Sequence, residues 1–181
     1  MYSHYESQKK EIETIKPRQL EIKLSDADVL RIAEKAGAHG LTVSQLIENF
    51  IGDLVGGTYS NGSDERMYAQ QWFERCWFSM FPDMTFLRYL TEWGGLEYVL
   101  ELWDDLQDAK NDIAYYEEHP DEPEPGEVEE IRAVLQDSQE QIDGYWNEYC
   151  QLKTEYKRGT LEEEMKKVLE WQAEYKRLAG E

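Results

Sequence analysis

Three aspartates spaced four residues apart, Asp104, Asp108 and Asp112, are the side chains of this chain whose type and spacing best suit a chemical role. In a helix such residues share one face and follow one another at steps of about 6 Å, a spacing of the same order as that of phosphates along a DNA strand. Like charges at this spacing destabilise an isolated helix, so the run favours a surface that meets a cationic partner. The alternative is a solvated face that serves solubility.

The same aspartates lie within the most acidic part of the chain. The 181 residues have a formal net charge of −20, and residues 101–130 hold 13 acids against one base, which is −12 of that total. Such a protein repels nucleic acid and attracts basic surfaces, so we expect a basic nucleic-acid-binding protein as its partner. The carboxylates expected to contact it are Asp104, Asp105, Asp108, Asp112, Glu117, Glu118, Asp121, Glu122 and Glu124.

Patterns typical of catalysis or cofactor binding are missing from the sequence. It contains no phosphate-binding glycine loop, no GxSxG and no HExxH, and His4, His39 and His119 are scattered. No Glu-x-x-His pair indicates a di-metal bundle, and two cysteines far apart indicate neither zinc nor a disulfide framework. With no apolar run long enough to span a membrane, we expect a cytoplasmic protein without enzymatic activity, cofactor or metal.

Before the acidic segment, the chain begins with a polar stretch over residues 1–16, expected as a tail or a frayed helix, and then a short alternating pattern. Leu20, Ile22 and Leu24 can share one face of a strand, with polar residues on the other. Ser25 or Asp26 can cap a following helix, and Thr42 or Ser44 a second one after Gly40. Residues 17–57 are therefore predicted to form a strand-helix-helix module, closed by a glycine-rich linker at 56–63.

Residues 64–181 are predicted to form an all-helical domain. Its aromatic cluster between Trp72 and Phe81 has helical spacing and is expected in a core. Apolar spacing predicts a long helix over about 96–118, which carries the aspartates, and a second one from Val128, separated by the proline-rich loop HPDEPEPGE. We expect these two helices to fold back into an antiparallel hairpin. The predicted fold class is mainly α.

The module QLEIKLSDADVLRIAEKAGAHGLTVSQLIENFI, between Arg18 and Val55, resembles the ribbon-helix-helix family. That resemblance implies that two chains pair their strands into an antiparallel ribbon, which enters the DNA major groove while the second helix grips a phosphate. It implies dimer contacts by Leu20, Ile22, Leu24, Leu46, Ile47 and Phe50, and DNA contacts by Gln19, Glu21, Lys23, Thr42 and Ser44. Glu21 lowers the affinity for phosphates, so the alternative is a module that only dimerises.

In overall character, an acidic chain without catalytic motifs that joins a dimer-type module to a helical hairpin resembles anti-CRISPR proteins. This resemblance implies an inhibitor from a phage or mobile element that binds a guide-RNA-loaded type II CRISPR-Cas effector nuclease and blocks target DNA recognition or cleavage. The alternative is a ribbon-helix-helix transcriptional regulator or antitoxin that binds DNA. The small share of the chain in the module, and its poorly charged strand, favour the inhibitor.

Overall fold

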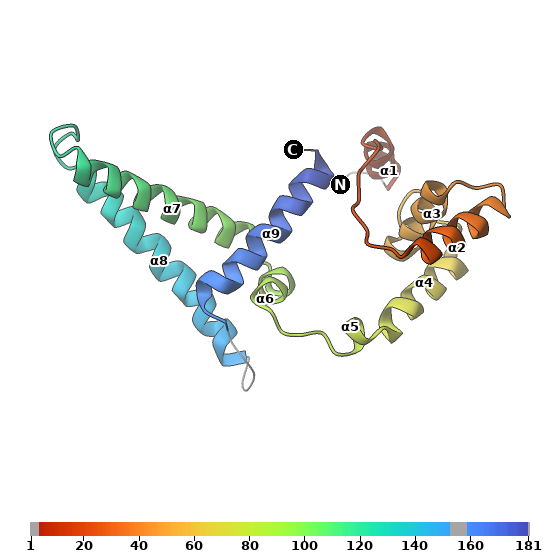
Figure 1. Cartoon of the computed structure of the whole chain (residues 1–181). Helices are drawn as coiled ribbons and strands as arrows, with labels where there is room; N and C mark the ends of the chain where they lie inside the picture. The colour runs from red at the N-terminus through yellow and green to blue at the C-terminus, as the bar shows by residue number, and fades with distance from the viewer. Residues whose placement is uncertain (1–3, 153–158, 181) are drawn as a thin grey trace. The chain divides into compact units, whose positions relative to one another are not determined.

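The computed structural model describes residues 4–152 and 159–180, and its regular structure there is helical (Figure 1), which confirms the mainly α class. Residues 1–3 of the predicted tail, and residues 153–158 and 181 of the predicted helical domain, lie outside this range. The helices are α1 (His4–Glu13), α2 (Asp26–Gly37), α3 (Val43–Val55), α4 (Ser63–Arg75), α5 (Trp77–Met80), α6 (Phe86–Trp93), α7 (Leu96–Glu118), α8 (Glu127–Leu152) and α9 (Leu161–Ala179).

The chain forms two compact units. The N-terminal unit runs to Asp83 and includes the chain end from Leu178, and the hairpin unit comprises Met84–Arg177. The boundary therefore lies about two helices later than the glycine-rich segment where the sequence placed it. The physical reason is that α4 packs on α3 within the N-terminal unit. Residues 4–13 of the expected tail or frayed helix form helix α1.

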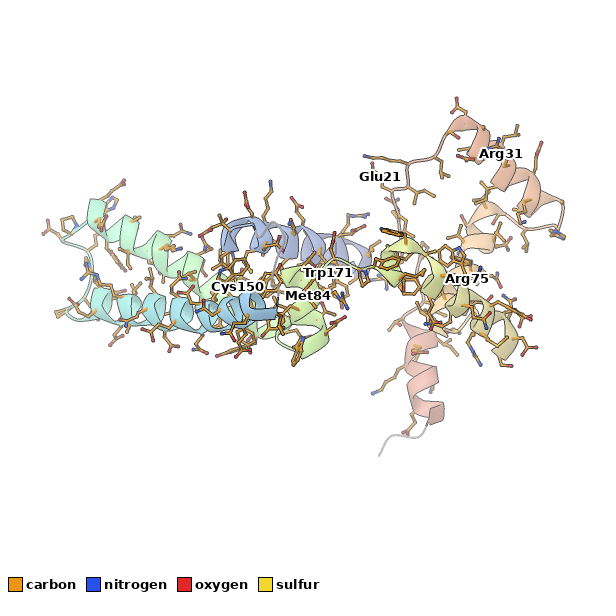
Figure 2. All side chains as sticks on the ribbon, turned by 90° about the horizontal axis from the view of Figure 1, so that it is seen from below. Glu21, Arg31, Arg75, Met84, Cys150 and Trp171 are labelled. Atoms are coloured by element: carbon orange, nitrogen blue, oxygen red, sulfur yellow. The ribbon has the colours of Figure 1, made fainter. Side chains whose placement is uncertain are left out.

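The strand expected within residues 17–24 is not present, and no other strand occurs among the residues that the structure describes. Residues 15–25 have no regular structure, and Figure 2 shows Glu21 on this open segment ahead of α2. A strand is stabilised by hydrogen bonds to a neighbouring strand, and a single chain of this kind supplies no neighbour. The prediction of a strand is thus wrong for the isolated chain.

The two helices of the predicted module form with side-chain caps at their N-termini. Ser25 Oγ accepts from the backbone N–H of Asp28 at 3.2 Å, and this fixes the start of α2. At α3, Thr42 Oγ1 accepts from the Gln45 N–H at 3.1 Å while Gln45 Oε1 accepts from the Thr42 N–H at 2.9 Å. This reciprocal capping box satisfies two amides that a helix start leaves unpaired.

Glycine at position 52 lets the chain return closely over α3. A Cβ on Gly52 would lie 2.7 Å from the backbone carbon of Tyr59, so a larger residue would displace the turn that leads into α4. In spite of this close contact the N-terminal unit has almost no core. Its buried residues, within the described part of the chain, are small: Ala36, Gly52 and Ala69.

The hairpin unit, in contrast, has a continuous apolar core. Helices α7 and α8 lie side by side and antiparallel (Figure 1). Tyr98 near the start of α7 donates to Gln141 just past the middle of α8, and Tyr116 near the end of α7 donates to Glu127 at the start of α8. Leu102, Leu106 and Ile142 pack between the two helices. A larger cluster joins α6 and α9 to their base: Phe86, Leu90, Val99, Tyr149, Met165 and Val168.

A buried carboxylate ties α9 to the start of α6. Glu164 is 3 % exposed, and its Oε2 accepts from the backbone N–H of Phe86 at 3.1 Å. Its Oε1 pairs with Lys167, and this hydrogen bond raises the pKa of the lysine. Because a buried amide without a partner is costly, Glu164 fixes how α6 meets the rest of the hairpin unit.

Replacing Glu164 by alanine is therefore expected to lower the free energy of unfolding by about 1–3 kcal/mol, since the Phe86 N–H loses its acceptor in a buried setting. The matched control is Glu170→Ala, which breaks an exposed pair with Lys166 at 3.9 Å and should cost less than about 1 kcal/mol. Urea unfolding followed by circular dichroism measures both. Equal losses in the two variants would show that Glu164 has no special role.

Candidate partner-binding surface

Six carboxylates form a continuous stripe along the outer side of α7. With a turn of about 100° per residue they fall within an arc of roughly 100°, and they extend over roughly 22 Å of helix. All six side chains are exposed. We call this surface the acidic stripe, and its members are Glu97, Glu101, Asp104, Asp105, Asp108 and Asp112.

The stripe faces outward because the other side of α7 is buried. Leu102, Leu106 and Ala109 lie in the packed face against α8, and Val99 joins the core at the base of the hairpin unit. Gly95, the residue before α7, lies close against Tyr145 of α8: a Cβ on Gly95 would lie 2.6 Å from the Tyr145 ring. The start of α7 is thereby held on α8, and its rotation is fixed.

The structure retains four of the expected contact residues in the stripe and adds two that the sequence analysis missed. Asp104, Asp108 and Asp112, spaced at fours, lie on it, and Asp105, expected from the acidity of the segment, lies beside them. Glu97 and Glu101 continue it toward the helix start, and their offsets of three and seven residues from Asp104 were the available signal. The other expected residue on the helix body, Glu117, has the register of the packed face and lies off the stripe.

Positive charge is kept away from the stripe. Lys110, the sole lysine or arginine in residues 96–130, lies on another side of α7. The charge of Lys110 acts on Glu162 in α9 instead. The pKa of Glu162 is lowered by hydrogen bonds from the backbone of Glu162 and from Thr160, and the charge of Lys110 lowers it further. Among the ion pairs formed within residues 4–152 and 159–180, none includes a stripe carboxylate. The stripe is thus a surface of one sign.

The remaining expected acids lie at the end of the hairpin, near or within its proline-rich loop: Glu118, Asp121, Glu122 and Glu124, all of them exposed. The Tyr115 ring stacks on His119 with centroids 4.3 Å apart, and its hydroxyl donates to Glu122 at 2.7 Å. This hydrogen bond to a carboxylate raises the pKa of Tyr115. The loop therefore continues the negative surface beyond α7, with one of its carboxylates held by a tyrosine.

Glu127 closes the loop at the start of α8. Its Oε2 accepts from the backbone N–H of Glu124 at 2.9 Å and its Oε1 from the Tyr116 hydroxyl at 2.8 Å. The backbone hydrogen bond and then the tyrosine hydrogen bond lower the pKa of Glu127. A lowered pKa in the folded state means that the stabilisation is present above the ordinary pKa of 4.5 and is lost as the pH falls through the folded-state value.

The residues expected to dimerise or to contact DNA lie in the N-terminal unit. Leu20, Ile22 and Leu24 are exposed on the open segment before α2, and Gln19, Glu21 and Lys23 are exposed between them. On α3, Leu46 and Ile47 are half-buried and Phe50 is exposed. Thr42, placed in the expected phosphate contact, is instead engaged in the capping box, and Ser44 beside it is exposed.

The described part of the chain contains neither a group of residues suited to hold a metal nor a helix suited to span a membrane. Across residues 4–152 and 159–180, no three histidine, cysteine, aspartate or glutamate side chains are grouped so that they could hold a metal ion. No helix in that part combines the length and the apolar character needed to cross a bilayer. No protein-family model, curated protein or solved structure matches the chain, so its function is argued from its own geometry.

Removing the Tyr116 hydroxyl is expected to raise the pKa of Glu127 part of the way toward its ordinary value, since the backbone hydrogen bond from Glu124 remains. An NMR titration of the Glu127 carboxyl in Tyr116→Phe measures this. Tyr115→Phe is the control, because that hydroxyl donates to Glu122 instead. If the two variants shifted the Glu127 pKa equally, the loop would not be closed by the Tyr116 contact.

Proposed function

We propose that this protein is an acidic inhibitor whose stripe on α7 occupies the basic nucleic-acid groove of another protein. The partner implied by its resemblance is a guide-RNA-loaded type II CRISPR-Cas effector nuclease, in which it would block target DNA recognition or cleavage. One observation carries the proposal: six exposed carboxylates along about 22 Å of one rigid helix, with no base on that face.

The chemistry of a nucleic-acid channel fits such a surface. These channels are lined with lysine and arginine to hold phosphates, and a guide-loaded nuclease keeps its channel positively charged. A row of carboxylates presents the same sign of charge at similar spacing and accepts the same charge-assisted hydrogen bonds. The packed face of α7 fixes the row in advance, so little ordering is needed when it binds.

The acidic loop at the hairpin end supports the same function. Asp121, Glu122 and Glu124 extend the negative field past the end of α7. A strong field of one sign speeds the approach of an oppositely charged partner. The same field repels DNA, so this unit is suited to compete with nucleic acid for a protein and not to bind nucleic acid itself.

Neutralising the stripe is expected to weaken inhibition. In the triple variant Asp104→Asn, Asp108→Asn, Asp112→Asn, three exposed charge contacts of about 0.2–1 kcal/mol each are lost, so the inhibitory concentration should rise by roughly threefold to a hundredfold. The control variant Glu129→Gln, Glu130→Gln, Glu170→Gln makes the same change in net charge at exposed positions outside the stripe. A DNA-cleavage assay with the guide-loaded nuclease measures both variants.

Two results would contradict the proposal. Equal inhibition by the stripe variant and the wild type would remove the acidic stripe as the contact. A gel shift of the protein's own promoter DNA at nanomolar protein, abolished by Lys23→Glu, would establish the alternative, a ribbon-helix-helix regulator. The exposed Gln19, Glu21 and Lys23 are the observation that favours this second candidate.

We propose further that the N-terminal unit pairs with a second copy through residues 18–24, as the ribbon-helix-helix resemblance implies. Leu20, Ile22 and Leu24 are 51 %, 60 % and 47 % exposed in the single chain. Within its described residues the unit buries no large apolar side chain, and so lacks the core that ordinarily offsets the entropy of folding. Pairing two strands would bury these side chains and also give the backbone N–H and C=O groups of residues 18–24 hydrogen-bond partners.

The substitution Ile22→Lys should therefore prevent pairing, because it places a charge in the centre of the paired apolar face. We expect the wild type to sediment as a dimer and Ile22→Lys to sediment as a monomer at the same concentration. Glu21→Lys puts the same side chain on the opposite face of the segment and should leave the dimer intact. Sedimentation velocity distinguishes these states, and a monomeric wild type would exclude pairing altogether.

A further inference from the structure

Five aromatic rings in the segment from α4 through α5 to the residue after it are exposed, although their helical spacing predicted a core. Their exposed fractions are 49 % for Trp72, 38 % for Phe73, 76 % for Trp77, 56 % for Phe78 and 56 % for Phe81. We call these five residues the aromatic surface. They lie outside the module that resembles the ribbon-helix-helix family, so the expected ribbon does not account for them.

The aromatic surface contains two groups of contacting rings, Trp72, Phe73 and Phe78, which reach α3, and the pair Trp77 and Phe81, with centroids 4.4 Å apart. Trp72 and Phe78 meet edge to face with centroids 6.4 Å apart, and Phe73 and Phe78 do so at 5.5 Å. Trp72 also contacts Phe50 of α3 at 5.3 Å. Because Phe50 is one of the residues expected at the dimer contact, the Trp72 end of the aromatic surface adjoins the proposed pairing face.

The area of the aromatic surface is large for a face in contact with water. At about 200 Å² per aromatic side chain, the exposed fractions correspond to roughly 550 Å². The largest apolar patch on a typical monomer is about 300–600 Å², and one side of a standard interface is about 800 Å². The five rings alone would thus supply the greater part of one side of an interface.

The local charge permits a second copy to approach here. Two copies of a chain with a net charge of −20 repel each other over most of their surfaces. Residues 66–81 are an exception, since Arg66 and Arg75 outweigh the single acid Glu74. Tryptophan, phenylalanine, methionine and arginine are also the residue types enriched in protein interfaces, while lysine, aspartate and glutamate are depleted.

We infer that the aromatic surface is an interface with a second copy of this chain, which extends the pairing of residues 18–24 onto α4 and α5. The inference rests on the proposed pairing and adds a surface that the ribbon does not include. In a two-fold symmetric dimer the same rings from both copies pack on each other, and each copy thereby acquires the core that its N-terminal unit lacks.

Sedimentation velocity of the full chain tests the inference. Trp77→Gln with Phe81→Gln should raise the dimer dissociation constant by roughly tenfold or more, the effect of losing one interface hot spot. Trp93→Gln is the control, since that ring is 67 % exposed on α6 in the hairpin unit. If Ile22→Lys abolishes the dimer but the aromatic variant does not weaken it, the inference fails while the ribbon pairing stands.

Photo-crosslinking provides a test that does not depend on weakened variants. A photoreactive phenylalanine at position 78, in a mixture of isotope-labelled and unlabelled chains, should form crosslinks between copies that map to residues 66–81. Crosslinks within one copy to the hairpin unit would overturn the inference, because they would show that the chain covers its own aromatic surface. An absence of crosslinks between copies in a sample that sediments as a dimer would overturn it as well.

Discussion

The apolar contact between α7 and α8 is the interaction on which the proposed function depends. Leu102 and Leu106 pack against Ile142, and the base of the hairpin unit is closed by Tyr149, Met165 and Val168. A helix has one rotation that buries such a face, and that rotation turns Asp104, Asp108 and Asp112 outward. The acidic stripe is therefore a consequence of core packing, and its carboxylates form no ion pair with any residue that the structure describes.

The two units are stabilised in different ways. The hairpin unit buries large side chains and ties α6 to α9 with Glu164, so it can carry the self-repulsion of 13 acids in residues 101–130. The N-terminal unit buries only small residues in its described part and leaves its aromatic rings in water. We propose that such a unit gains its core from a second copy of this chain, the partner that its charge and apolar faces favour.

Sequence periodicity identified the helices of the hairpin and three of the four aspartates of the stripe, because burial of one helix face is a local pattern. Glu97 and Glu101 were missed although they lie seven and three residues before Asp104 in the same helical register, and the close contact of Gly95 with Tyr145 holds the start of α7 so that both face the same way as the aspartates. Sequence periodicity also predicted a strand at residues 18–24. An alternating pattern indicates that a segment can pair as a strand, but it does not indicate whether the partner strand lies in the same chain. The exposure of Trp77 and Phe81 was missed for a related reason: helical spacing cannot distinguish a core from an interface.

The central claim is that α7 competes with nucleic acid for a basic groove. The most direct measurement is the affinity of the purified protein for the guide-loaded nuclease at increasing salt, with and without a saturating duplex that carries the target sequence. The account predicts that log Kd rises linearly and steeply with log salt concentration, and that bound target DNA abolishes binding. An affinity that is independent of salt, or a complex that forms equally well on the DNA-bound nuclease, would contradict it.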